Sequence, residues 1–221
     1  MANRNLIFWV KQMNSIKSLI LLLPFLLSGC SLNNTHKSNA NYYFLNQNRN
    51  LSAVGRAILV QLGNDSTYPQ ISSDVTDAIY EAAQKKQVFG LTVVRENDPR
   101  WRNLQLDKFA DYSLEQLSAM HKSLRSNAVL RGTITRYEPF PHLIIGLRLE
   151  LIDLTDGQLL WALEQIWDAA DKNTQDRVND YYNQSFLPGS KSLEVGLGTV
   201  SSLKFIKFVA YEIAETLQSP K

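Results

Sequence analysis

The chain has 221 residues, 44% hydrophobic and 20% charged, a composition that excludes a disordered chain, a collagen-like repeat and a multi-span membrane protein. Its 23 basic and 21 acidic side chains give a formal net charge of +2, and three of the basic ones precede position 30. The remaining body is nearly neutral and lacks the concentrated basic field that nucleic-acid binding requires. The length allows one domain of good size or two small ones.

The front of the chain has the features of a secretory signal. Residues 19–29 read LILLLPFLLSG, an uncharged run that a proline interrupts. A helix that spans a bilayer takes about 20 apolar residues, so this run is too short and suits the apolar part of a signal segment instead. The basic residues Lys11 and Lys17 precede it. Met13 begins a compact signal in its own right, so either Met1 or Met13 is the true start.

The signal segment ends at the single cysteine of the chain, and its last four positions resemble a bacterial lipobox: Leu27, Ser28, Gly29 and Cys30. The resemblance implies that residues 1–29 are a lipoprotein signal peptide and that Cys30 receives more than one acyl chain, palmitate among them. Two or three chains anchor a protein firmly to a membrane. Ser31 stands where an aspartate favours the inner membrane in such lipoproteins, which implies the periplasmic face of the outer membrane. The alternative is an ordinary or uncleaved signal with an incidental cysteine.

Residues 31–50 contain seven asparagines and no acidic side chain. Such a stretch has little to bury, so we predict that residues 30–50 form a lipidated, flexible tether with a reach of roughly 25 Å. The segment YYFL at 42–45 is the exception. Two interpretations remain for it, namely packing against the folded body and contact with the lipid surface.

From about residue 51 the pattern becomes that of a folded domain. Residues 57–62, AILVQL, predict a strand that ends at the turn signal GND. Ser72 or Ser73 can cap a helix that runs to about residue 87, with apolar side chains at helical spacing. Residues 89–94, FGLTVV, predict a second strand.

A capping box, Ser113-Leu114-Glu115-Gln116, opens a second predicted helix. Its apolar side is expected to hold four residues: Leu114, Leu117, His121 and Leu124. Residues 128–137, AVLRGTITRY, predict a third strand.

The clearest hairpin of the chain spans residues 142–167. Apolar and charged side chains alternate along 142–154, the dipeptide Asp156-Gly157 is a strong two-residue turn signal, and residues 158–167 return with apolar side chains on one face. Charged residues dominate 168–180, which predicts a solvated helix or loop. A final helix over about 201–217 carries a wide apolar face, which suggests that it packs against a sheet.

The predicted order is therefore β-α-β-α-β-β-β-α. It indicates one α/β (α+β) domain over residues 51–221, in which helices cover a single mixed sheet. The hairpin at 142–167 requires an antiparallel pair, so a purely parallel sheet is unsuited to this sequence.

Three segments of this domain resemble a known periplasmic module: AILVQLGN, NAVLRGTITRYE and LRLELIDLTDGQLLWALEQIWDA. The module is shared by the curli-secretion lipoprotein CsgG, the penicillin-binding-protein activator LpoB and the amino-terminal domain of TolB. Its motifs are matched by residues 127–132 and by Asp153, Gly157 and Trp161, and the resemblance covers about residues 54–170. It implies a non-enzymatic envelope protein that binds other proteins. No second pair of alternating runs suits a membrane barrel, so we expect no pore.

A search for chemistry yields no catalytic, cofactor or metal site. His36, His121 and His142 are far apart in sequence, and one cysteine cannot build an all-thiolate metal site. Residues 186–192 resemble a phosphate loop only faintly, and no Gly-x-Ser-x-Gly motif occurs. We therefore predict no enzyme activity, no cofactor and no metal.

Two segments combine residue types that are enriched at protein-binding hot spots. The first holds Arg100 and Trp101, and the second, YEPFPH, holds Tyr137 and Phe140 between prolines. We predict that these four residues are partner contacts. The alternatives are that Trp101 folds back on the core and that Phe140 forms the rim of the core.

The leading hypothesis is a lipid-anchored periplasmic module that binds an unidentified envelope protein in an assembly, secretion or cell-wall complex. A different class is a structural subunit that self-associates as a homo-oligomer at the outer membrane. A third is an envelope hydrolase, for which the sequence offers no nucleophile with a base beside it.

Overall fold

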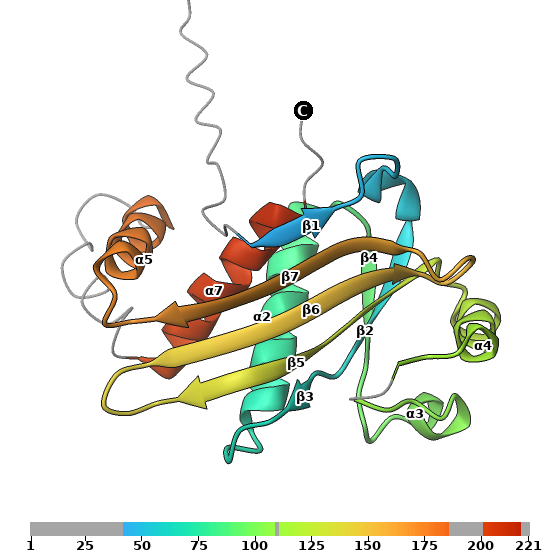
Figure 1. Ribbon diagram of the computed structural model, residues 1–221, viewed down its shortest axis with the longest axis horizontal. Helices are drawn as coiled ribbons and strands as arrows, with labels where there is room; N and C mark the ends of the chain where they lie inside the picture. The colour runs from blue at the N-terminus through green and yellow to red at the C-terminus, as the bar shows by residue number, and fades with distance from the viewer. Residues whose placement is uncertain (1–41, 109–110, 186–200, 218–221) are drawn as a thin grey trace, which may run out of the picture. The chain divides into compact units, whose positions relative to one another are not determined.

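The computed structural model describes residues 42–108, 111–185 and 201–217, all of them within one compact unit (Figure 1). Seven strands form a single sheet. They are β1 (Tyr43–Leu45), β2 (Arg56–Val60), β3 (Gly63–Asn64), β4 (Gly90–Val94), β5 (Ala128–Glu138), β6 (Ile144–Asp153) and β7 (Leu159–Asp168). The described helices are the 3₁₀ helix η2 (Leu51–Val54) and the α-helices α2 (Ile71–Lys86), α3 (Pro99–Asn103), α4 (Leu114–Leu124), α5 (Lys172–Ser185) and α7 (Ser202–Thr216).

The sheet is mixed, as predicted, with the strand order β1-β7-β6-β5-β2-β4 and with β3 beside β5. β2 pairs in parallel with both β4 and β5, while β5, β6 and β7 form an antiparallel meander. Parallel neighbours need a crossover connection, and α2 and the α3–α4 segment supply it. The α/β fold class predicted from the sequence is therefore confirmed.

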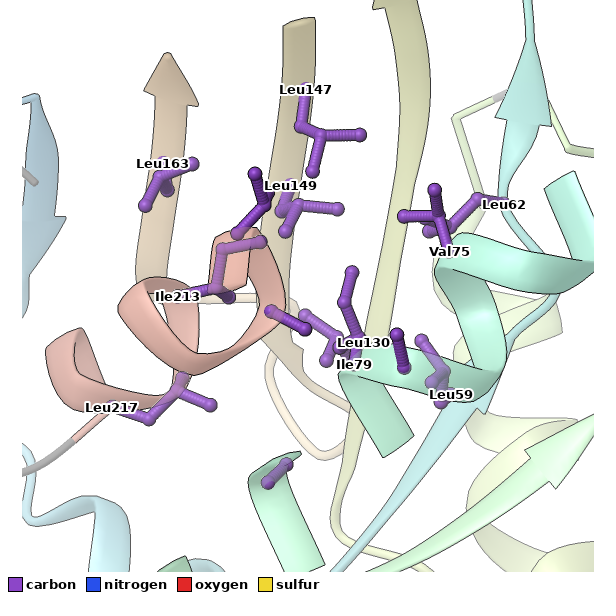
Figure 2. Packing of buried hydrophobic residues seen from close by; sticks show 14 of the residues in the cluster. Leu59, Leu62, Val75, Ile79, Leu130, Leu147, Leu149, Leu163, Ile213 and Leu217 are labelled. Atoms are coloured by element: carbon purple, nitrogen blue, oxygen red, sulfur yellow. The ribbon is translucent and has the colours of Figure 1, made fainter. Parts of the chain in front are cut away.

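Helices α2 and α7 cover one face of the sheet and lie behind it in Figure 1. The main core fills the space between them and the strands, and Figure 2 shows leucines of β6 and β7 pointing toward Ile213 of α7 and Ile79 of α2. Burying one such side chain contributes about 1.5–3 kcal/mol. This layer therefore supplies the largest share of the hydrophobic stabilisation.

A second, smaller core lies on the opposite face, beneath α3 and α4. Ile58 and Val60 of β2 and Val129 of β5 face this side and pack with Trp101, Leu117 and Met120. Because residues alternate between the faces of a strand, Leu59 and Leu130 belong to the main core instead.

The sequence predicted helices α2 and α4 correctly, but some of their capping and buried residues were predicted wrongly. The capping box at Ser113 and Gln116 is confirmed, but α4 buries Leu117 and Met120 and leaves Leu114 65% exposed. In α2 the predicted cap is wrong, because the helix begins at Ile71 after Gln70, and Ser72 lies inside it. The buried Ser72 hydroxyl instead donates to the carbonyl oxygen of Leu62 at 2.5 Å.

The sheet begins within the segment predicted as a tether. Tyr43, Phe44 and Leu45 form β1 and pair antiparallel with Leu163, Ala162 and Trp161 of β7. Packing against the body is thus the correct interpretation of the YYFL segment, and the folded body starts before residue 51. The short elements β3, α3 and α5 also add to the predicted order.

The hairpin predicted at 142–167 is confirmed as β6 and β7, but its connection is longer than two residues. Residues 154–158 join the strands, with Gly157 at φ +71, a left-handed conformation that glycine adopts at little cost. Carboxylate oxygens of Asp153 and Asp156 accept hydrogen bonds from the backbone N–H groups of Thr155 and Gln158. These local bonds stabilise the longer loop.

Candidate functional site

The face of the sheet that carries the second core is only partly covered. In Figure 1 no labelled helix lies in front of β5, β6 and β7, whereas α3 and α4 lie at one end and α5 at the other. Five side chains point from the strands toward this open side, and we call them the ladder face: Phe44, Arg131, Arg148, Glu150 and Glu164.

Cross-strand ion pairs run over the ladder face. The Arg131 guanidinium donates to Glu150 at 2.8 Å and to Asp111 at 2.5 Å, and Arg148 donates to Glu164 at 2.8 Å. The hydrogen bond from Arg148 holds the pKa of Glu164 below its usual value. Exposed ion pairs add little stability, so this arrangement solubilises the face and sets its charge pattern more than it holds the fold together.

Large apolar side chains interrupt this polar surface along β1 and β7. Tyr42 is 73% exposed, Phe44 50% and Ile166 57%. A shallow hollow beside the two aromatic rings is lined by residues that include Tyr42, Phe44, Arg148 and Ala162. Exposed aromatic residues beside arginines are typical of protein-binding surfaces.

A deeper cleft of about 650 Å³ lies where β7 extends beyond β1, and α5 forms its far wall. We call it the α5 cleft. Its lining is almost entirely polar: Tyr42, Thr135, Glu164, Gln165, Ile166, Asp171, Asn173, Thr174 and Arg177.

A buried ion pair fixes the wall of this cleft to the main body. Arg177 of α5 donates to Glu212 of α7 at 2.6 and 2.8 Å, and the indole N–H of Trp167 donates to the same carboxylate at 2.6 Å. Burial raises the pKa of Glu212, while the bonds from Trp167 and Arg177 oppose that rise. Since an uncompensated buried charge is costly, each partner is needed to keep the other in place.

The predicted partner contacts lie apart from one another. Arg100 and Trp101 sit in α3 at one end of the sheet, whereas Tyr137 and Phe140 lie at the far end of β5 (Figure 1). Trp101 is only 9% exposed and packs in the second core, which corrects the expectation that its indole is free for a partner. The reason is that α3, begun by the Asp98 cap and Pro99, turns the indole back onto the sheet.

The other three predicted contacts differ in their exposure and in their bonding partners. Phe140 is 84% exposed, so the rim-of-core alternative does not describe it. Tyr137 is half-buried and meets Tyr68 edge-on, with ring centroids 5.3 Å apart. Arg100 is held by Asp98. The predicted lipidation site Cys30 and its lipobox, Leu27, Ser28 and Gly29, lie outside the described residues.

No group of three or more metal-ligating side chains occurs within residues 42–108, 111–185 and 201–217. His121 Nδ1 lies 2.7 Å from the carbonyl oxygen of Ser126, and His142 lies 3.4 Å from Asp168 on the surface. In the same part of the chain, no helix has the length and apolar character that crossing a membrane requires.

Sequence reasoning missed the ladder face and the α5 cleft as sites. The alternation of charged and apolar residues in β6 was visible in the sequence, and it indicates a strand with one solvent-exposed face. Nothing in the sequence indicated that α5 would lie along the edge of β7, because that contact is tertiary. The cleft could be found only once both elements were placed.

No protein-family model and no curated protein matches this sequence. Among solved structures the chain is similar to the PelC dodecamer from Paraburkholderia phytofirmans, with a TM-score of 0.50 and 13% identity over 81% of this chain and 96% of that one. It is also similar to lipoprotein GNA1162 from Neisseria meningitidis (TM-score 0.44, 15% identity, 59% and 97% covered). For LpoB from Escherichia coli the values are 0.40, 13%, 52% and 58%.

These identities establish a likeness of fold alone. LpoB, which the sequence resemblance named, is among the structurally similar proteins, and PelC and GNA1162 extend that group. The resemblance to CsgG and to TolB stays a prediction.

Proposed function

We propose that the chain is a lipoprotein of the bacterial envelope, anchored at the periplasmic face of the outer membrane through Cys30, whose α/β domain binds another envelope protein without catalysis. The observation that carries the binding role is the ladder face. It presents the exposed ring of Phe44, with the exposed ring of Tyr42 beside it, and an ordered row of ion pairs over strands that no described helix covers. Such a face combines shape, apolar anchors and charge, which a specific protein contact uses.

Site-specific photo-crosslinking in native envelopes tests the binding role. A photoreactive residue in place of Ala162, which lies between Phe44 and Glu150 of the ladder face, is expected to capture a defined protein band. The matched control replaces Lys85, an exposed residue of α2 on the covered side of the sheet. Equal capture from both positions, or none from Ala162, would contradict binding through this face.

The anchor has a separate test. Cys30→Ser is expected to abolish fatty-acid labelling and to release the protein from membranes, because the thiol is the acyl acceptor. Membrane association that persists in this variant would count against the lipid anchor and would leave the ladder-face result unaffected.

A second candidate function is self-association into a structural ring at the outer membrane. It is favoured by the fold likeness to PelC, which forms a dodecamer in its structure. Native mass spectrometry of the lipidated chain in detergent decides between the two. A defined oligomer supports the second candidate, and a monomer over a wide concentration range excludes it.

A further inference from the structure

A cavity of about 310 Å³ lies on the helical side of the molecule, among residues of α2, α5 and α7. Its apolar lining comes from Ala78 and Ala82 of α2 and from the rings of Tyr181 and Tyr211. The two alanines are one helical turn apart on the same side of α2, and their short side chains leave room that larger ones would fill. No residue of the ladder face lines this cavity, so it is a site separate from the proposed protein contact.

The two tyrosines give the cavity an aromatic lining. The rings of Tyr181 of α5 and Tyr211 of α7 have centroids 4.7 Å apart and are tilted by 36°. Burial raises the pKa of both hydroxyl groups, so both side chains are uncharged at neutral pH. Each ring is only half-buried and still has surface to offer. Aromatic rings pack favourably in offset or edge-on contacts, so this lining suits a ligand that contains a ring.

The polar part of the lining has an excess of positive charge. It contains Lys85, Lys86 and Lys207, of which Lys86 forms an ion pair with Glu215. Lys85 of α2 and Lys207 of α7 are exposed and make no hydrogen bond or ion pair with any described residue. Glu81 and Glu215 together do not balance the three lysines. Two ammonium groups from two helices are therefore available to an anion that enters from solvent.

We infer that this cavity binds a small aromatic anion, a single ring that carries a phosphate or a carboxylate group. Its volume is at the lower end of the range of about 300–1,000 Å³ that is typical of small-molecule sites, which suits one ring better than a complete lipid. The ring lies against Tyr181 and Tyr211, and the anionic group faces Lys85 and Lys207. Such a ligand yields no protein cross-link, so Lys85 keeps its use as the control position for the ladder face.

Binding is tested by isothermal titration calorimetry on the full chain, held in a detergent with an uncharged headgroup, after subtraction of a titration into detergent alone. Phenyl phosphate and phenylacetate are the aromatic anions. Benzyl alcohol supplies the ring without the charge, and inorganic phosphate supplies the charge without the ring. We expect at least one aromatic anion to bind at one site per chain, more tightly than either comparison compound. Failure of both anions, or equal binding of benzyl alcohol or inorganic phosphate, would overturn the inference.

Charge variants locate the anionic group. Lys207→Gln is expected to weaken binding about two- to fivefold, the effect of one exposed charge pair. Glu81→Gln is expected to bind at least as tightly as the parent, because it removes a repulsion. The matched control is Lys122→Gln, which changes an exposed lysine of α4 on the opposite face of the sheet and should leave the affinity unchanged. Equal affinities of the two lysine variants, or weaker binding by Glu81→Gln, would contradict the assignment.

Ala82→Leu tests the cavity itself. The added side chain occupies the space that the ring would take, so binding is expected to weaken at least tenfold. The melting temperature is expected to stay level or rise, because a leucine fills apolar space that an alanine leaves open. Undiminished binding would mean that the ligand does not enter the cavity. If the larger side chain lowers the melting temperature, Lys207→Gln, which leaves the core unchanged, decides in its place.

Discussion

Leu147, Leu149 and Leu151 of β6 are fully buried beneath the helices, whereas Arg148 and Glu150, which alternate with them, lie on the open side of the same strand. The covered face packs leucines, tryptophans and phenylalanines from sheet and helices into one cluster. The open face carries a second core only under α3 and α4 and then the ion pairs, while the α5 cleft lies at the edge of β7 and involves residues of both faces.

The contrast indicates that the covered face of the sheet stabilises the fold and that the open face is available for recognition. Apolar burial is the main favourable contribution to folding, while exposed ion pairs add little. The covered face can therefore hold the fold while the residues of the open face remain free to vary with a ligand or partner. Substitutions on the two sides should differ strongly in their effect on stability, and the following changes test that expectation.

Trp161→Ala should produce the largest loss. Its side chain is fully buried in the main core, and its indole N–H donates to the Thr216 hydroxyl at 3.1 Å. We expect a loss of about 3–5 kcal/mol in the free energy of unfolding, measured by urea denaturation. Trp161→Phe is the control, because it keeps most of the apolar volume and should cost much less. Similar losses for the two variants would show that packing is not the main contribution here.

Trp101→Ala should come next, with a loss of about 3 kcal/mol in the same measurement. The indole is 9% exposed and belongs to the smaller core on the open side of the sheet. Arg102→Ala, an exposed neighbour in α3, is the control and should leave the midpoint nearly unchanged. An unaltered urea midpoint for Trp101→Ala would mean that the indole does not stabilise the core, and it would support Trp101 again as a partner contact.

The case of Trp101 shows what the sequence could and could not predict. The hairpin over 142–167 and the final helix follow from long periodic patterns that tertiary contacts reinforce. The structure begins α3 with the Asp98 cap and Pro99, but a helix of five residues has too few positions for its sequence to reveal a buried face. The type of an element is thus easier to predict than the direction of one side chain.

The remaining differences have a tertiary origin. β1 is three residues long, so its pairing with β7 depends on the partner strand and not on its own pattern. The final helix was expected to carry a wide apolar face, yet Leu203 in its first turn is 62% exposed, since α7 begins only at Ser202 and this turn extends past the core. The α5 cleft requires β7 and α5 to be placed first, so it has no signature in the sequence.

Arg148→Ala should have a much smaller effect than the tryptophan substitutions. The residue is exposed, and its ion pair with Glu164 spans two strands on the open side. We expect the melting temperature to stay within experimental error of the parent. The adjacent change Leu149→Ala, on the covered side of the same strand, should cost about 2–5 kcal/mol. If the two neighbours proved equally sensitive, the division between the faces would not hold.

Phe140→Ala should be the mildest change for the fold and the most selective for recognition. The ring is 84% exposed in the loop between β5 and β6, so its removal should alter the free energy of unfolding by no more than about 0.5 kcal/mol. An exposed phenylalanine beside two prolines loses little conformational entropy on binding, which favours a role as an anchor for a partner. Cross-linking from Ala162 should then yield less product in Phe140→Ala than in the parent, provided that the partner reaches both positions. An unchanged yield would confine the contact to the ladder face and leave Phe140 without a role in it.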